Sequence, residues 1–459
     1  MISLEKIKGL TDEENCKLSQ LVDAYNYHYF SNQKKRKYYE GKISLGDVNL
    51  GIALPDGIKK LEIGCGWGSK TVDVLASRSM FDGFVGSDGN NSDQVINLLN
   101  DNNLIAEYMK ACKDELKYGC TFVTLSADET IGCKIRFHSP MTASALWNGE
   151  KGRIDCGMAI IDTVPDESQE VGWQPRIIHL YFDDCIIVIE AVGNNEIKVT
   201  RHPHIMGRPL MEPLIWNATS DKPFGQSRIK EPIRHLIEGY VRTVANATIG
   251  LEFATSPQKY LLGITDEQFD AVINQKFRQY VGSIIASTTN PENGSTPNFG
   301  QLPQGNIEPH VQMLRMLATQ YSAQTGLSIT DTGVINDANP SSSDAILAQS
   351  QTLVSLAEQL NASNGNSLRV IAQMAQAIVD RKTLEELSDS QKNVIAHFKN
   401  PAMPSVSVTA DAAIKIASAR PNFSNTDTFL EMIGFSQADI RRIKAEETRS
   451  RGLSVLEEV

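Results

Sequence analysis

CTFVTLSAD (120–128) is the first of a series of short strand-like runs that decide the fold of this 459-residue chain. The runs that follow are CKIRFHS (133–139), CGMAIIDTV (156–164), RIIHLYFDD (176–184), CIIVIEAVGN (185–194) and EIKVTRHPH (196–204). Turn residues separate them, and no helical segment of useful length lies between them. Parallel strands need crossover connections of a dozen or more residues. The six runs therefore predict an antiparallel meander.

Ahead of the meander, the segment KKLEIGCGWGSK (59–70) raises the question of an S-adenosylmethionine-dependent methyltransferase. It contains an acidic residue followed by three alternating glycines, Glu62, Gly64, Gly66 and Gly68. Such enzymes place this order where a first strand turns into a helix, because glycines let the backbone approach the ligand and the carboxylate accepts from a hydroxyl. Asp88, after a short apolar run, fits the next acidic position. The enzyme needs a parallel sheet, however, which an antiparallel meander does not supply.

Composition places the chain among globular proteins, because 41% of its residues are hydrophobic and 22% are charged. The sequence has no apolar run long enough to span a membrane, and its beginning lacks the layout of a signal peptide. We therefore expect a protein of its producer's cytosol that does not contact membranes. The net charge of −11 opposes a general affinity for nucleic-acid phosphates.

Cysteine and histidine spacing gives no sign of a metal site. All seven cysteines lie in the first 185 residues, in an odd number and without a C-x-x-C pair. This pattern is typical of reduced, mostly buried thiols. His202 and His204 flank a proline, and no cysteine or third histidine lies near them in the sequence. The sequence therefore predicts no bound metal and no cofactor.

Helical patterns occupy the rest of the chain. Residues 11–39 predict an amphipathic helix, and 93–117 predict one long helix. After residue 222, apolar residues at three- and four-residue intervals predict two packed helices, at about 226–254 and 307–325. The apolar positions assigned to their packed faces are Ile229, Ile233, Tyr240, Val311, Leu314 and Ala318.

The segment between these two helices is rich in Pro, Gly, Asn and Thr, which predicts a loop or an extended excursion. After the second helix, β-branched residues around Asp331-Thr332-Gly333 predict a short hairpin. A third helix is expected over about 342–382, and Asn364-Gly365 would interrupt or kink it.

This order of elements resembles the portal proteins of tailed bacteriophages, and the resemblance spans most of the chain. RKYYEGKI (36–43) is similar to the aromatic Tyr-Tyr-x-Gly element of that family, and GWGSKTVDVLASRSMFDGF (66–84) is similar to its Gly-Trp turn and helix. KPFGQSRIKEPIRHLI (222–237) and LEFATSPQKYLLGI (251–264) carry the family's Pro-Phe-Gly and Pro-Gln spacing. QTGLSITDTGVINDANPSSSDAI (324–346) resembles the segment around the tunnel loop. The Glu62-to-Gly66 run is not general in portals, and we attribute it to chance.

The resemblance implies an α+β chain with a mainly α portal fold, including a mixed wing domain, a tunnel-loop hairpin and a long wing helix. The implied division is a wing of amino-terminal helices and antiparallel sheet over 1–225, a first stem helix over 226–254, a clip over 255–306, a second stem helix over 307–326, a tunnel loop over 327–341, a long wing helix and wing end over 342–400, and a crown-like carboxy-terminal region over 401–459.

The family's function follows from the same resemblance. It implies a ring of twelve subunits at one capsid vertex. The ring would be a passive channel through which DNA is packaged and ejected, and the chain would not be an enzyme. The implied partners are other copies of the chain, double-stranded DNA in transit, terminase, the major capsid protein, and head-completion or adaptor proteins. The ring would be assembled in the host cytoplasm and would remain in the virion. The implied DNA-channel residues of the tunnel loop are Ser328, Thr330, Asp331, Thr332, Asn336 and Asp337.

Two alternatives remain from the sequence. One is the methyltransferase, and the other is a capsid-associated binding module without a channel. The absence of a G-x-x-x-x-G-K-[ST] motif agrees with a passive channel whose motor is a separate ATPase. Between Gln279 and Asp344 the only Lys or Arg is Arg315. A wall of this composition would not trap phosphates as DNA slides past.

Overall fold

The computed structural model describes most of the chain, and its contacts divide it into two compact units. The first unit comprises Met1–Tyr39, Ser69–Lys230 and Ser341–Val459, and the second comprises Glu40–Gly68 and Glu231–Pro340. The described residues are 6–43, 63–86, 93–165, 173–192, 196–255, 259–264, 284–288, 298–301, 306–333, 343–402, 406–435, 439–440 and 442–449.

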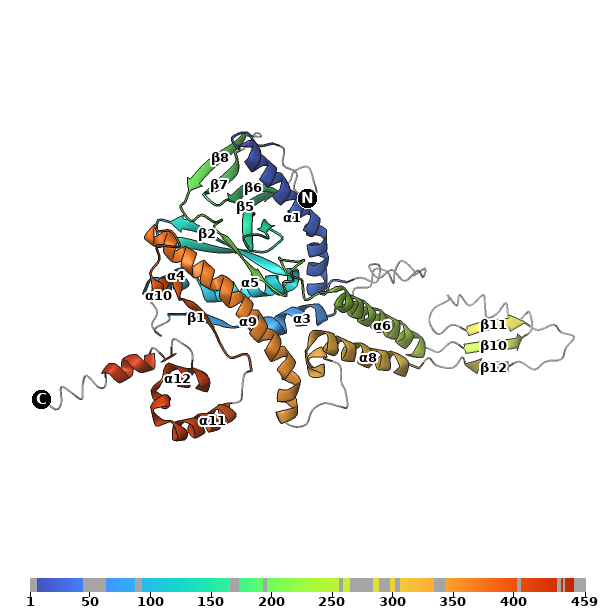
Figure 1. The fold of residues 1–459 in the computed structure, drawn as a ribbon. Helices are drawn as coiled ribbons and strands as arrows, with labels where there is room; N and C mark the ends of the chain where they lie inside the picture. The colour runs from blue at the N-terminus through green and yellow to red at the C-terminus, as the bar shows by residue number, and fades with distance from the viewer. Residues whose placement is uncertain are drawn as a thin grey trace. The chain divides into compact units, whose positions relative to one another are not determined.

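The first unit contains a five-stranded antiparallel sheet in which neighbours in sequence are neighbours in space (Figure 1). Its strands are β4 (Ala143–Asn148), β5 (Arg153–Pro165), β6 (Trp173–Tyr181), β7 (Cys185–Val192) and β8 (Glu196–Pro203). The meander prediction is confirmed here. It follows from the short connections, which allow only antiparallel pairing.

The first two predicted runs belong to a separate sheet. β2 (Cys120–Asp128) pairs with β3 (Gly132–His138) on one side and with β9 (Met211–Ile215) on the other, both antiparallel. A single meander of six strands is therefore wrong in detail. β4 and β9 were not predicted, because ASALWN and MEPLI are short and MEPLI contains a proline.

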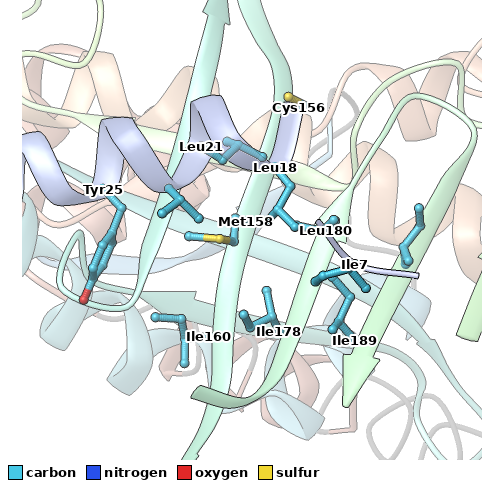
Figure 2. Close-up of a cluster of buried hydrophobic side chains, with 12 residues drawn as sticks. Ile7, Leu18, Leu21, Tyr25, Cys156, Met158, Ile160, Ile178, Leu180 and Ile189 are labelled. Carbon is cyan, nitrogen blue, oxygen red and sulfur yellow. The ribbon is translucent and has the colours of Figure 1, made fainter. Parts of the chain in front are cut away.

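One hydrophobic cluster of the first unit lies between helix α1 (Asp12–Tyr39) and the five-stranded sheet, as Figure 2 shows. Strand residues two apart point to the same face of a sheet, so Cys156, Met158 and Ile160 of β5 face the helix together. Leu18 and Leu21 of α1 pack onto them at helical spacing. Full burial of an aliphatic side chain stabilises by about 1.5–3 kcal/mol. The helix predicted over 11–39 is thus confirmed, but its amphipathic character is not, because Asn32 is buried while Tyr27 and Phe30 are exposed.

The single helix predicted over 93–117 is instead two helices, α4 (Asp93–Asp101) and α5 (Leu104–Tyr118). Asn102 is buried at the break, where its side-chain amide donates to the carbonyls of Leu98 and Cys133 at 3.1 and 3.0 Å. Its oxygen accepts from the backbone amide of Ile135 at 2.8 Å. Asn103 then takes φ 48°, a left-handed conformation that asparagine tolerates. These contacts with β3 stabilise the break.

Helix α9 (Ser343–Asp380) runs for 38 residues, about 57 Å at 1.5 Å per residue, and packs on β2, β3 and β9. The predicted interruption at Asn364-Gly365 is wrong, because the helix is continuous there. Asn364 is fully buried, and its side-chain amide donates to Glu115 Oε2 at 2.7 Å and to Tyr108 Oη at 3.0 Å. These hydrogen bonds to α5 hold the helix where the sequence favours a break.

The strand that follows the glycine run does not join a parallel sheet. Helix α3 (Trp67–Ala76) leads to β1 (Phe81–Val85), which pairs antiparallel with β13 (Ile395–Phe398). Further elements of the first unit are α10 (Asp389–Lys392), α11 (Val406–Ala419), η4 (Pro421–Asn425) and α12 (Asp427–Ile433). The helical carboxy-terminal region agrees with the sequence pattern.

The second unit contains two long helices that pack against each other, α6 (Glu231–Thr255) and α8 (Glu308–Thr325), followed by the 3₁₀ turn η3 (Ile329–Thr332). Between the helices in sequence lies a three-stranded sheet in the order β11-β10-β12, where a loop or extended excursion was predicted. Its strands are β10 (Lys259–Ile264), β11 (Ile284–Thr288) and β12 (Asn298–Gln301). β10 pairs parallel with β11 and antiparallel with β12.

All seven cysteines are free thiols, of which five are buried, as predicted from their spacing. Within the described part of the chain, no helix is both long enough and apolar enough to cross a membrane.

Candidate functional site

The pair of helices α6 and α8 forms the framework of the candidate site. On α6, Ile233, Ile237, Val241 and Ala245 repeat every four residues and are buried. On α8, the buried side chains are Leu317, Ala318, Tyr321 and Thr325. A Cβ at Gly239 of α6 would lie 3.3 Å from the Leu317 side chain, so this glycine allows close contact of the helices. The apolar residues therefore form one seam within the second unit.

The stem residues expected from the sequence occupy different environments. Ile229 is fully buried but precedes α6, which begins at residue 231 rather than 226. Ile233 is 4% exposed, and Tyr240 is partly buried. On α8, Leu314 is partly buried and Val311 is exposed. Sequence reasoning missed Leu317 and Tyr321, although both continue the three- and four-residue spacing from Leu314.

Trp67 connects the two helices and the turn after them. It is 3% exposed, and its ring stacks on Tyr321 of α8 with centroids 4.6 Å apart and an interplanar angle of 21°. Its ring also lies 4.8 Å from Tyr240 of α6, whose pKa is raised by burial. The indole Nε1 donates to the carbonyl of Thr332 at 3.0 Å, and Tyr321 Oη donates to the carbonyl of Trp67 at 2.7 Å.

The glycine-rich segment therefore contains a buried tryptophan. Trp67 is the only large apolar side chain between Gly64 and Lys70, and this pattern was the sequence feature that could have indicated its packing role. Burial raises the pKa of the neighbouring Cys65 thiol to about 11. Gly41, with φ +69°, approaches so closely that a Cβ would lie 2.9 Å from the Cys65 carbonyl oxygen. The Tyr-Tyr-x-Gly and Gly-Trp elements therefore meet in space.

The described part of the predicted tunnel loop is a capped 3₁₀ turn rather than a hairpin strand. Ser328 Oγ accepts from the backbone amide of Asp331 at 3.4 Å, and the Asp331 carboxylate accepts from the backbone amide of Ser328 at 3.2 Å. This Ser-x-x-Asp capping box favours a helical turn. Thr332 is buried, its hydroxyl donates to the Ile329 carbonyl at 2.6 Å, and Thr330 is exposed.

Some residues singled out from the sequence lie outside the described residues. These are Asn336 and Asp337 of the tunnel loop and Glu62 and Asp88 of the methyltransferase pattern. His202 is exposed at the end of β8, and His204 Nδ1 accepts from the Met206 amide at 3.4 Å. In the described ranges, no three His, Cys, Asp or Glu side chains are grouped as a metal site would require.

Comparison with known proteins identifies the family. The family model described as "Phage portal protein, SPP1 Gp6-like" matches residues 18–452. Among curated relatives, the portal protein of Mycobacterium phage D29 is 22% identical over 451 residues, which covers 95% of this chain and 90% of that protein. The portal protein of Mycobacterium phage L5 is 23% identical over 380 residues, covering 80% of this chain and 75% of that protein.

Two similar solved structures come from gene transfer agent particles. A chain of the neck of the native particle, computed with C12 symmetry, is 11% identical with a TM-score of 0.43, covering 80% of this chain and 89% of that chain. A chain of the virion of the native particle is 12% identical with a TM-score of 0.43, covering 77% and 86%. Since the family model extends over nearly the whole sequence, this chain belongs to the SPP1 Gp6-like family of phage portal proteins.

Proposed function

We propose that copies of this chain form a ring at one vertex of a phage capsid and that DNA enters and leaves through the channel along the ring axis. The observation that carries the proposal is the match of the portal family model to residues 18–452. Rings form when one patch of a subunit binds a different patch of an identical neighbour and the rotation closes. We expect twelve subunits.

The proposal assigns each segment of the chain to one region of a portal subunit. Residues 1–225 and the long helix over 342–400 form the wing, α6 and α8 form the stem, and 255–306 form the clip. Residues 327–341 form the tunnel loop, and 401–459 form the crown. Support comes from the α6–α8 pair, whose buried seam would give a ring of stems a stiff unit to repeat.

Exposed apolar side chains of α8 support assembly. Val311, Met313 and Met316 are 36%, 39% and 47% exposed in the single chain. Met313 and Met316, three residues apart, lie on the same side of the helix, and exposed apolar side chains that lie together are typical of interaction sites. In the proposed ring the neighbouring subunit covers them.

The charge of the proposed channel segment supports DNA passage. The stretch from Gln279 to Asp344 carries Arg315 as its single Lys or Arg. Lysines and arginines repeated around a ring would hold phosphates and slow DNA, whereas short polar side chains contact DNA weakly and through water. Terminase, the major capsid protein and head-completion or adaptor proteins are the proposed partners. Assembly takes place in the host cytoplasm, and the ring ends up in the virion.

Mass measurement on the purified protein tests assembly. Twelve copies of the 50.5 kDa chain make a particle of about 606 kDa, and any closed ring has a mass that is a fixed multiple of 50.5 kDa. A protein that stays monomeric at micromolar concentration and when mixed with capsid protein would contradict the proposal.

The methyltransferase has less support. The strand after α3 pairs antiparallel with β13, whereas the cofactor sheet of such an enzyme is parallel. A binding module without a channel would have to leave Met313 and Met316 of α8 uncovered by other copies.

A further inference from the structure

We propose that Trp67 positions residues 327–333, the beginning of the tunnel loop. Its indole N–H holds the Thr332 carbonyl, at the point where η3 ends and the remainder of the loop begins. The inference rests on the proposed function, because only in a portal ring does the direction of this loop matter to DNA.

The first step is the position of the hydrogen bond. Carbonyls at the end of a helix lack partners within the helix and are satisfied by other groups. The Thr332 carbonyl belongs to the last residue of η3, and a side chain 265 positions away in the sequence reaches it. Trp67 therefore acts as a cap supplied from a distant part of the chain.

The second step is that two glycines delimit the segment held by Trp67. Gly326 and Gly333 both adopt left-handed conformations, with φ of 71° and 74°. The chain turns at these two glycines, on either side of residues 327–332, since glycine takes these angles without strain. Trp67 contacts the segment next to Gly333.

The third step concerns the other end of the segment. There the contacts come from α8 itself, because Ser322 Oγ donates to the Leu327 carbonyl at 2.7 Å and Thr325 Oγ1 accepts from the Leu327 amide at 3.3 Å. α8 thus holds the beginning of the segment. At its end, the Trp67 contact adds to the hydrogen bond from the Gly333 amide to the Thr330 carbonyl at 3.4 Å.

The fourth step is that Trp67 is itself firmly placed. Its ring lies against Tyr321 and Tyr240, and its carbonyl accepts from the Tyr321 hydroxyl. Because the Trp67 side chain packs on both helices, its hydrogen bond holds the Thr332 carbonyl at a fixed place relative to them. Displacement of residues 63–68 relative to α8 would therefore move residues 327–333.

The test uses Trp67→Phe, which removes the N–H donor and keeps a ring that can stack on Tyr321. Hydrogen–deuterium exchange is measured on the assembled protein, together with the fraction of phage heads that contain DNA. Loss of one hydrogen bond is expected to speed exchange in 327–333 by about two- to tenfold. Exchange in α6 and ring yield should not change, while the fraction of DNA-filled heads falls.

Two further variants complete the experiment. Trp147→Phe makes the same chemical change on β4 in the first unit and should leave exchange in 327–333 unchanged. Tyr321→Phe removes the hydroxyl that holds the Trp67 carbonyl, so it should raise exchange in 327–333 in the same direction. It also provides the test if Trp67→Phe does not fold.

The outcomes separate the inference from the proposed function. Unchanged exchange in 327–333 in the Trp67→Phe protein would overturn the inference, as would an equal rise throughout α6 and α8, which indicates general destabilisation. Faster local exchange with normal DNA filling would also overturn it, because the loop would then not need this contact. Failure of the wild-type chain to form rings would instead overturn the proposed function, and exchange would still report on the Trp67 contact.

Discussion

The buried carboxyl of Glu115 offers a quantitative test of the packing between α5 and α9. Glu115 is fully buried, and its Oε2 accepts from Asn364 at 2.7 Å. Among the described residues, no ion pair involves this carboxyl. Burial raises the pKa of Glu115 to about 8, although the hydrogen bond from Asn364 acts in the opposite direction. The carboxyl is therefore protonated at pH 7 in the folded protein.

The expected pH dependence follows from proton binding. The ordinary pKa of glutamate is 4.5, so between pH 4.5 and 8 the folded state holds a proton that the unfolded state has released. The free energy of unfolding then falls as pH rises, by about 1.4 kcal/mol per pH unit. Glutamine is neutral at every pH, and at pH 7 Glu115→Gln should stabilise the protein by about 3 kcal/mol.

Neighbouring groups do not titrate in this window. Tyr108 and Cys112 of α5 and Cys120 of β2 lie around Glu115, and burial raises the pKa of all three, so they stay neutral below pH 8. The pH dependence of the difference between wild type and Glu115→Gln therefore belongs to this carboxyl.

The assay is chemical denaturation of both proteins at several pH values from 5.5 to 8. The stability advantage of Glu115→Gln should grow steadily across this range. Glu107→Gln is the matched control, because Glu107 lies on the same helix and pairs with Lys110 at the surface. Its effect should stay below about 1 kcal/mol at every pH. An advantage of Glu115→Gln that does not change with pH would refute the reasoning.

Three further predictions concern assembly, the loop and the glycine run. Ile233→Asp places an unpaired charge in the buried seam at a cost of several kcal/mol, so size-exclusion chromatography should show loss of rings. His235→Asp, at an exposed position of the same helix, should keep them. A normal yield of rings for Ile233→Asp would disprove the stem assignment. Asp331→Lys should leave rings intact but slow DNA packaging or ejection, with partial relief by salt, whereas Asp331→Asn, which keeps a capping oxygen, should behave as wild type. Normal packaging by Asp331→Lys virions would indicate that this turn tolerates any charge. Calorimetry with S-adenosylmethionine should detect no binding, and saturable micromolar binding that Gly66→Val abolishes would restore the enzyme interpretation.

Features set by local pattern could be predicted from the sequence. The strands β5 to β8 were visible as apolar runs separated by turns, and α1 was visible from its helical spacing. The α6–α8 pair was visible for the same reason, except that its packed face on α8 lies nearer the carboxyl end than Val311. Such patterns depend on neighbours within a few residues.

Features set by distant partners could not be predicted. The break at Asn102 depends on hydrogen bonds to β3, and the continuity of α9 at Asn364 depends on Glu115 and Tyr108 of α5. The place of Trp67 depends on Tyr240 and Tyr321, far along the sequence, and its indole N–H donates to the Thr332 carbonyl. In each case a polar group finds a buried partner from another element, which outweighs the local preference.

Electron microscopy of the purified assembly tests the central claim most directly. The account predicts a closed ring with a central channel wide enough for double-stranded DNA, in which a neighbouring subunit covers the face of α8 that carries the exposed Met313 and Met316. A compact particle without a central hole, or a ring in which this face of α8 stays in solvent, would contradict it.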